Sequence, residues 1–283
     1  MRDLSQKPAW LRKKFRLSDC SRVKTLLRGL NLHTVCEEAM CPNVGECFHK
    51  NTAAFMILGN ICTRDCKFCG VAKGEPLPLD DTEPQNIAQA VKAMGLNYVV
   101  VTSVTRDDLH DKGAGQFIDT TAEIRKTSPE TKIELLIPDF NAEEKLIERV
   151  VQIKPDVINH NIETVKRLYP DIRSKANYRR SLQVLRIIKG IDSSMRTKSG
   201  FMLGLGETGE EVKELLKDLR SVGCDFLSIG QYLQPSREHY PVQEFVNPEK
   251  FEEYRVFAMD LGFSAVKSSP YTRSSYQADE YMV

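Results

Sequence analysis

A chain of 283 residues is long enough for one large domain or two small ones. Hydrophobic residues make up 41% of it and charged residues 28%, a balance that excludes a disordered chain, a collagen-like fibre and a disulfide-rich miniprotein. Lys and Arg (40) nearly cancel Asp and Glu (39), which gives no sign of a nucleic-acid partner, and no apolar run approaches the ~20 residues needed to span a membrane.

The amino-terminal segment is strongly basic. The first 28 residues hold nine basic side chains against Asp3 and Asp19, a net charge of +7. Such a segment is either a solvated arm or a docking surface for an acidic partner. It has no apolar stretch of the kind that directs export, so we expect a cytoplasmic protein. The basic residues are Arg2, Lys7, Arg12, Lys13, Lys14, Arg16, Arg22, Lys24 and Arg28.

Cysteine is concentrated in a short part of the chain. Six of the eight cysteines lie between Cys36 and Cys69, whereas Cys20 and Cys224 stand alone. In a reducing compartment, clustered cysteines are read as metal ligands before disulfide partners. Cys224 precedes a predicted strand and is expected to be a small buried residue. No role is assigned to Cys20.

From residue 55 onward, strand and helix patterns alternate. Apolar runs predict strands over 55–59, 97–103, 132–138, 156–160, 198–204 and 225–230, with a further strand over 263–267. Helical spacing of apolar residues predicts helices over 84–94, 115–126, 142–151, 177–189, 209–222 and 248–261. Asn141 and Asn247 are the expected caps of two of these helices, and Thr208 precedes a third. Six strand–helix units predict a parallel sheet, as an open doubly wound sheet or a partial barrel.

Three cysteines follow the first predicted strand directly. Cys62, Cys66 and Cys69 have the spacing C-x3-C-x2-C. An iron–sulfur cluster normally takes four cysteines, so three thiolates can hold a [4Fe–4S] cluster whose fourth iron is open. Zinc is the alternative, but a second cysteine pair of the usual zinc spacing does not follow. The spacing, with Phe68 before the last cysteine, resembles the signature of the radical S-adenosylmethionine (SAM) superfamily.

That resemblance implies a fold and a chemistry. The family fold is a partial (β/α)6 barrel of the TIM type, which agrees with the six predicted units. In the family, the open iron of the cluster binds the amino and carboxylate groups of SAM. An electron from the cluster then cleaves SAM to methionine and a 5′-deoxyadenosyl radical.

A second cysteine triad lies upstream. Cys36, Cys41 and Cys47 have the spacing C-x4-C-x5-C, one ligand short of a closed site. They could be buried thiols, or a zinc site completed by His33 or His49. The spacing and its neighbours resemble the auxiliary-cluster motif of lipoyl synthases. The segments that match this family are 35–39, 41–43, 46–47, 52–59, 102–109, 159–164, 197–200, 204–208, 230–236 and 273–276.

The resemblance assigns the missing ligand of the second triad to a serine. In the Arg-Ser-Ser-Tyr segment the serine directly before the tyrosine is Ser275, and spacing cannot separate it from its neighbour Ser274. A serine oxygen is harder than a thiolate and should hold iron less firmly. That property suits a cluster that is dismantled to donate sulfur. Arg273 would lie near the same cluster.

Contacts to SAM are expected at the ends of the fourth and fifth predicted strands. Asn161 and Glu163 follow the fourth strand, where polar residues face the mouth of a barrel, although each could instead cap a helix or bond within its loop. Strand alternation points His160 away from that face, which leaves a structural role and a contact both open. Gly204 and Gly206 would let the backbone approach the adenosyl group, although such a pair is often only a tight turn. The remaining candidates are Ser103, Lys198 and Glu207.

Together these motifs imply insertion of two sulfur atoms, at C6 and C8, into an octanoyl chain on a lysine of a carrier protein. The implied cofactors are two [4Fe–4S] clusters, with SAM as cosubstrate. The implied partners are octanoylated lipoyl carrier domains (2-oxoacid dehydrogenase E2 or glycine cleavage H protein) and a low-potential electron donor of the ferredoxin or flavodoxin type. A methylthiotransferase is a rival, but it usually carries an extra RNA-binding domain for which no residues remain. A zinc-stabilised binding protein is the non-enzymatic rival.

The same reading divides the chain into three segments. Residues 1–54 would carry the auxiliary-cluster cysteines, residues 55–268 would form the partial barrel, and residues 269–283 would form a tail with the Arg-Ser-Ser-Tyr motif.

Overall fold

An eight-stranded sheet organises the computed structural model, which describes residues 7–11, 21–50 and 52–282. The strand order is β1-β2-β5-β6-β7-β8-β9-β10, so β1 and β10 are the edges. All neighbours from β2 to β10 run parallel, whereas β1 pairs antiparallel with β2. The strands are β1 (His33–Thr34), β2 (Ala54–Ile57), β5 (Tyr98–Ser103), β6 (Lys132–Leu136), β7 (Val157–Asn159), β8 (Thr197–Leu203), β9 (Phe226–Gln231) and β10 (Ala265–Ser268).

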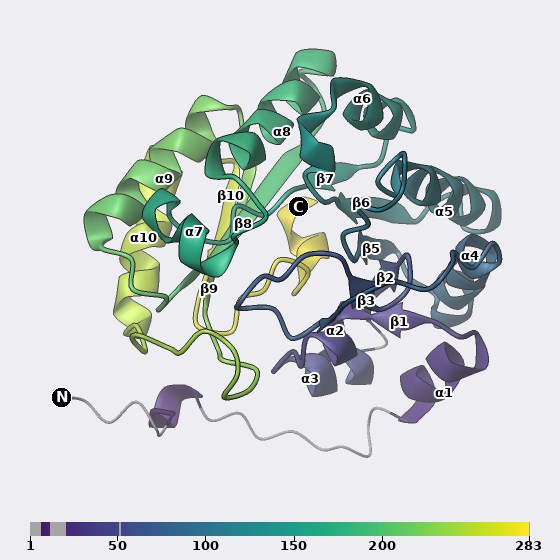
Figure 1. Cartoon of the computed structure of the whole chain (residues 1–283), viewed down its shortest axis with the longest axis horizontal. Helices are drawn as coiled ribbons and strands as arrows, with labels where there is room; N and C mark the ends of the chain where they lie inside the picture. The colour runs from purple at the N-terminus through teal and green to yellow at the C-terminus, as the bar shows by residue number, and fades with distance from the viewer. Residues whose placement is uncertain (1–6, 12–20, 51, 283) are drawn as a thin grey trace.

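Helices surround this sheet on the outside (Figure 1). The helices of the described residues are α1 (Ser21–Gly29), α2 (Val35–Glu38), α3 (Val44–His49), α4 (Glu83–Met94), α5 (Ala114–Thr127), α6 (Glu144–Gln152), α7 (Tyr169–Ile172), α8 (Tyr178–Ile191), α9 (Gly209–Ser221) and α10 (Pro248–Asp260). Short 3-10 turns are η1 (Ala9–Leu11), η3 (Phe140–Ala142), η4 (Lys166–Leu168) and η5 (Ala278–Met282), and β3 (Ile61–Cys62) pairs with β4 (Ala72–Lys73) in a separate small sheet.

The six predicted strand–helix units are confirmed, and the fold is a partial α/β barrel. β10 adds a seventh parallel strand, as the pattern over 263–267 suggested. The predicted caps Thr208 and Asn247 each accept a hydrogen bond from a backbone N–H of the first turn of their helix. Arg2, Arg12, Lys13, Lys14, Arg16 and Cys20 lie outside the described residues.

The predicted cap at Asn141 is wrong. Asn141 has a φ of 55° and lies inside η3, and α6 begins only at Glu144, with Glu143 in the cap position. The cause is tertiary: the side-chain oxygen of Asn141 accepts a 3.3 Å hydrogen bond from Arg64, and its N–H donates to Asp139. These contacts hold Asn141 in a left-handed turn that a helix cap cannot share.

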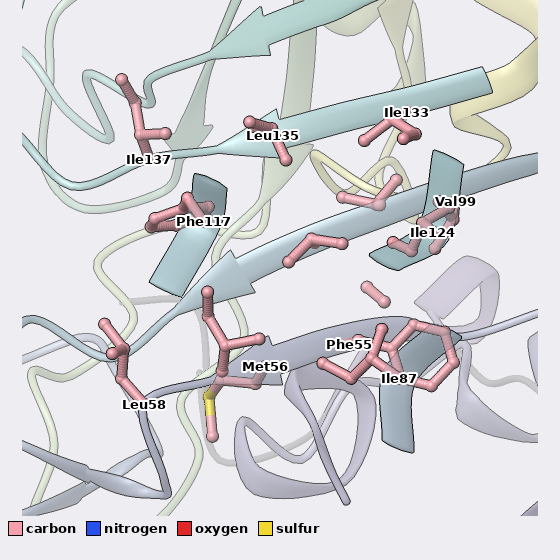
Figure 2. Close-up of a cluster of buried hydrophobic side chains, with 14 of the residues drawn as sticks. Phe55, Met56, Leu58, Ile87, Val99, Phe117, Ile124, Ile133, Leu135 and Ile137 are labelled. Carbon is pink, nitrogen blue, oxygen red and sulfur yellow. The ribbon is translucent and has the colours of Figure 1, made fainter. Parts of the chain in front are cut away.

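Register separates the two faces of the sheet. Phe55, Val101 and Leu135 are neighbours across β2, β5 and β6, and all three are fully buried. Because side chains alternate along a strand, the residues before and after each of these three on its own strand face the opposite side of the sheet. Figure 2 shows the apolar packing of these strands with Ile87, Phe117 and Ile124 of α4 and α5. Burial of each such side chain contributes about 1.5–3 kcal/mol to folding.

The carboxy-terminal segment, residues 269–282, lies inside the curve of the sheet (Figure 1). Tyr281 is buried against Val157 and Phe226, the first residues of β7 and β9. The segment therefore closes the amino-terminal end of the strands from within. Among the described residues, the longest helices are too short or too polar to cross a membrane.

Candidate metal and cofactor site

One cavity of about 1240 Å³ is lined by both cysteine triads, the Arg-Ser-Ser-Tyr segment and the ends of several strands. It lies along the inner face of the sheet, where Met56, Thr102 and Leu136 are in register. The lining includes the six clustered cysteines and both serines of the Arg-Ser-Ser-Tyr segment: Cys36, Cys41, Cys47, Cys62, Cys66, Cys69, Ser274 and Ser275. The six thiols are free. Residues more than 200 positions apart in sequence therefore share one chamber.

The C-x3-C-x2-C segment begins at the end of β3. The backbone N–H groups of Arg64 and Thr105 both point at the sulfur of Cys62, at 3.4 Å. Burial raises the pKa of the Cys66 thiol, and it raises that of Cys69 to about 12. These thiols are therefore neutral in the free protein, and a bound cation would have to displace their protons.

Arg64 fixes this cysteine segment to two other loops. Its guanidinium makes paired hydrogen bonds to Asp107 at 2.7 and 2.8 Å and to Asp139 at 2.7 and 2.8 Å. Arg180 also donates to Asp139, at 2.8 Å. Burial alone would raise the pKa of Asp139, but the hydrogen bonds and charge of Arg64 outweigh it and hold that pKa well below the usual range. No sequence pattern assigned a role to Arg64, although its position inside the cysteine motif was an available signal.

The C-x4-C-x5-C segment is built on two short helices beside β2. Thr34 accepts the capping hydrogen bond from Glu37 at the start of α2, which carries Cys36, and α3 carries Cys47. Burial, and secondarily the nearby Cys41, raises the pKa of the Cys36 thiol to about 12. Neither histidine considered as a zinc ligand lines the cavity: His33 contacts Glu38 at 3.2 Å, and His49 is exposed. Within the described ranges, no three His, Cys, Asp or Glu side chains converge on a single-ion site.

The carboxy-terminal segment is bonded to this second cysteine segment. Asn43 donates a 2.7 Å hydrogen bond to the carbonyl of Tyr271, and the hydroxyl of Tyr276 donates to Glu46 at 2.8 Å. These bonds place the two serines, which lie between Tyr271 and Tyr276, beside the cysteines.

The two serines differ in their surroundings. Ser274 accepts from the Asn159 amide at 2.8 Å and donates to the Asn161 oxygen at 2.9 Å, so its proton and one of its lone pairs are already engaged. Ser275 lines the cavity, and its hydroxyl makes no hydrogen bond within the described part of the chain. A hydroxyl of a cavity-lining residue with its lone pairs unused is available as a ligand.

Three predicted contacts to SAM line the cavity: Ser103, Asn161 and Glu163. The hydroxyl of Ser103 is buried without a partner in the described residues. Glu163 has a φ of 66°, an uncommon conformation for this residue type, and its backbone pairs with Gly200 and Met202 of β8. Burial raises the pKa of the Glu163 carboxyl, with the nearby Arg173 opposing the shift. An uncommon backbone conformation and a carboxyl with a raised pKa at one residue are typical of functional sites.

His160 and Arg173 also line the cavity. His160 lies one residue beyond the end of β7, so strand alternation no longer governs its direction. Its Nδ1 contacts the Ile137 carbonyl at 2.9 Å, whereas its Nε2, like the Nε of Arg173, is buried with no partner in the described residues. Arg173 follows α7 and contacts the thiol of Cys66. No pattern in the sequence indicated Arg173, because its contacts are tertiary.

Four of the predicted SAM contacts are not brought to the cavity lining: Lys198, Gly204, Gly206 and Glu207. Lys198 is fully buried in an ion pair with Glu134. Glu207 folds back to accept hydrogen bonds from the N–H groups of Gly204 and Leu205, at 2.6 and 2.9 Å. A Cβ on Gly204 would lie 2.2 Å from Gln231 Nε2, so close packing within the protein, rather than an open cradle, requires that glycine. Cys224 is fully buried, as expected.

The chain is similar to known proteins over nearly its whole length. The family model of the radical SAM superfamily matches residues 56–219, and that of the N-terminal domain of lipoyl synthase matches residues 2–41. The lipoyl synthase of Caldicellulosiruptor saccharolyticus is 57% identical over 98% of this chain and 97% of its own, and that of Caldicellulosiruptor bescii is 54% identical over 97% and 94%. The crystal structure of methylornithine synthase aligns with a TM-score of 0.56 and 13% identity over 93% of this chain and 88% of its own, which is a likeness of fold.

Proposed function

The chain belongs to the lipoyl synthase family of the radical SAM superfamily, and from that premise we propose which residues perform the reaction. The enzyme inserts two sulfur atoms, at C6 and C8, into an octanoyl chain carried by a lysine of a lipoyl carrier protein. It works with SAM and [4Fe–4S] clusters. Cys62, Cys66 and Cys69 hold the cluster that binds SAM. Cys36, Cys41, Cys47 and Ser275 hold the auxiliary cluster.

The donor set fits these groups. Each cysteine triad presents three thiols to the same cavity, and a [4Fe–4S] cluster with three thiolates keeps one iron for another ligand. When bound, the clusters and SAM supply the radical that removes hydrogen from the octanoyl chain and the sulfur that replaces it. The Ser103 hydroxyl and the Arg173 Nε, which have no hydrogen-bond partner in the described part of the chain, supply polar groups for SAM in the same chamber.

The single observation that carries the assignment is the convergence of both triads and Ser275 on one cavity. Sulfur transfer requires the target carbon to lie between the two sites, and a shared chamber permits that placement. The Ser275 hydroxyl has no hydrogen-bond partner in the described ranges, whereas the Ser274 hydroxyl both accepts and donates one, and this difference supports Ser275 as the oxygen ligand.

Side chains around the cavity take the remaining roles. Arg173, a half-buried cation beside Cys66, pairs with the carboxylate of SAM. Asn161 and Glu163 bind its polar groups. Residues 271–280 line the cavity and exclude water from the reacting carbon, which protects a radical from side reactions.

The finer partners are those that the family resemblance implies. The carrier is 2-oxoacid dehydrogenase E2 or glycine cleavage H protein, and a ferredoxin or flavodoxin type of protein donates the electron. Lipoyl carrier domains are typically acidic, so the basic amino-terminal arm steers them to the enzyme. Lys13, Lys14 and Arg16 lie outside the described residues, and changing all three to Glu tests the arm. An unchanged KM for the carrier at low salt would contradict this part of the proposal.

The test of the function is mass spectrometry of an octanoyl-lysyl peptide. The peptide is incubated without oxygen with reconstituted protein, SAM and a strong reductant. We expect a product with two added sulfurs, absent with Cys47→Ala or Ser275→Ala and retained with the matched controls Cys224→Ala and Ser264→Ala. An unchanged peptide with 5′-deoxyadenosine formed would contradict the substrate. No SAM cleavage by cluster-loaded protein would contradict the Cys62, Cys66 and Cys69 assignment.

A further inference from the structure

An ion pair lies buried inside the barrel, away from the thiols. Lys198 Nζ lies 3.1 Å from each carboxylate oxygen of Glu134, and both side chains are completely buried. The same carboxylate accepts hydrogen bonds from the Tyr98 hydroxyl at 2.7 Å and from the Asn159 amide at 2.8 Å. Four strands, β5 to β8, therefore contribute one group each to a buried polar cluster, in which the Asn159 side-chain oxygen has no partner among the described residues.

The cluster extends to the carboxy-terminal segment through Asn159. Its amide nitrogen donates both to Glu134 and to the hydroxyl of Ser274, at 2.8 Å each. The Ser274 hydroxyl in turn donates to the Asn161 oxygen at 2.9 Å. Because an amide has two N–H donors, one fixed by the carboxylate leaves the other with a defined direction.

Lys198 of the ion pair also contacts the carboxy-terminal segment, at a second residue. Lys198 Nζ lies 4.1 Å from the centre of the Tyr281 ring, a cation–π contact. The Tyr281 hydroxyl is bonded to Ser228 at 2.8 Å and to the Leu227 carbonyl at 3.0 Å. The segment is thus held at Ser274 and at Tyr281, on both sides of one buried pair.

We propose that the Glu134–Lys198 pair, acting through Asn159, is an internal anchor that orients Ser274 and thereby directs the adjacent Ser275 into the cavity. Glu134, Asn159, Lys198 and Ser274 are positioning residues, whereas Ser275 is the ligand. A buried ion pair contributes little net stability, because desolvation offsets the attraction, and specifying one geometry is a role that such pairs can serve. The inference rests on the proposed role of Ser275.

Hydrogen exchange in the full-length, metal-free protein tests the anchor directly. Asn159→Ala and Ser274→Ala should each speed amide exchange in residues 272–277 by about fivefold, the scale of one lost hydrogen bond. The double variant should exchange no faster than the faster single variant, because both changes remove the same link. Ser274→Thr, which keeps the hydroxyl, should retain protection. Ser264→Ala is the matched control, on an exposed residue.

Ser275→Ala separates positioning from ligation. It should leave exchange of residues 272–277 unchanged in the metal-free protein. A second measurement uses a background in which Cys62, Cys66 and Cys69 are all changed to Ala. In that background the iron bound per chain reports the Cys36, Cys41 and Cys47 site alone. In that background Ser275→Ala, Ser274→Ala and Asn159→Ala should all lower the iron retained on gel filtration, whereas Ser264→Ala and Ser274→Thr should not.

The outcomes distinguish the two proposals. One outcome is that Asn159→Ala and Ser274→Ala leave both the exchange rate of residues 272–277 and the iron retained per chain unchanged. It would overturn the anchor and leave the assignment of Ser275 standing. Additive exchange effects in the double variant would also overturn it, because the two residues would then act separately. A third outcome is faster exchange in the two variants together with a parent protein that binds no iron at Cys36, Cys41 and Cys47. It would contradict the proposed function instead.

Discussion

Gly230 of β9 lies so close to Thr272 that a Cβ atom at Gly230 would be 2.1 Å from the Thr272 carbonyl oxygen. The same atom would lie 3.1 Å from the guanidinium of Arg273. The absence of a side chain at this inner-face position is therefore what allows the carboxy-terminal segment to lie directly on the sheet.

Gly230→Ala should displace that segment. A Cβ within 3 Å of backbone cannot be relieved by a rotamer change, so we expect a loss of about 1–3 kcal/mol in the free energy of unfolding. Sulfur insertion should fall more than SAM cleavage, because the serines move while the Cys62 segment does not. Chemical denaturation and product analysis measure the two effects. Gly190→Ala is the control, since nothing lies within 4 Å of a Cβ there, and it should be neutral or slightly stabilising.

His160 should make stability depend on pH. Burial lowers its pKa to about 4, although the Asp139 carboxylate opposes the shift, whereas the unfolded chain titrates near 6.5. Between these two pKa values the unfolded state binds more protons than the folded state. The contribution of neutral His160 to stability is therefore full above pH 6.5 and is lost as the pH falls toward 4. The linkage relation gives a loss of about 3 kcal/mol. Denaturant unfolding at pH 7, 5.5 and 4.5 should reveal it, and His160→Gln should flatten the profile. A steep profile in His160→Gln would assign the effect to other groups.

Arg64→Met should destabilise the protein and loosen the first cysteine segment. It leaves two carboxylates without their shared cation, and removing one partner of a buried pair costs about 3–5 kcal/mol. Urea unfolding of the metal-free protein measures the loss. In a Cys36→Ala, Cys41→Ala, Cys47→Ala background, iron retained at the Cys62 segment should also fall. Arg167→Met is the comparison: this exposed residue pairs with Glu211, and its loss should change stability far less than the loss of Arg64.

Arg173→Met should weaken SAM binding. A hydrogen bond to a charged group contributes about 1.5–3 kcal/mol, so the Kd for SAM should rise by roughly tenfold or more. Equilibrium binding to the cluster-loaded protein gives the Kd, and the melting temperature shows whether the fold survives. Arg179→Met removes an exposed charge from the adjacent helix and should leave the Kd unchanged. Equal affinities in both variants would remove Arg173 from the SAM site.

The sequence predicts the parts of this protein that depend on local pattern. Alternating strand and helix periods gave the six units, and side-chain chemistry gave the caps at Thr208 and Asn247. Asn141 failed as a cap because its conformation depends on Arg64, which is 77 positions away. Lys198 was expected at the cavity, but its position on the inner face also suits an ion pair with Glu134, which is 64 positions away.

The cysteine motifs could be recognised from spacing, whereas the surroundings of the serines could not. Nothing in the Arg-Ser-Ser-Tyr segment distinguishes its two hydroxyls. The difference appears only when Asn159 and Asn161, on another strand end, are brought to Ser274. Such contacts are set by the global fold and carry no local signature.

The bond between Asn43 and the carbonyl of Tyr271 joins residues 228 positions apart. Contacts that close so long a loop form late in folding, because the chain must be ordered before they are gained. The cysteines of the second triad can come together early, since 11 positions separate the first from the last. A folding chain would thus offer three ligands before the fourth arrives, and iron delivered in that interval would be held by an incomplete site. Slowing the docking of the carboxy-terminal segment should therefore lower the yield of correctly loaded enzyme even where the finished protein is stable.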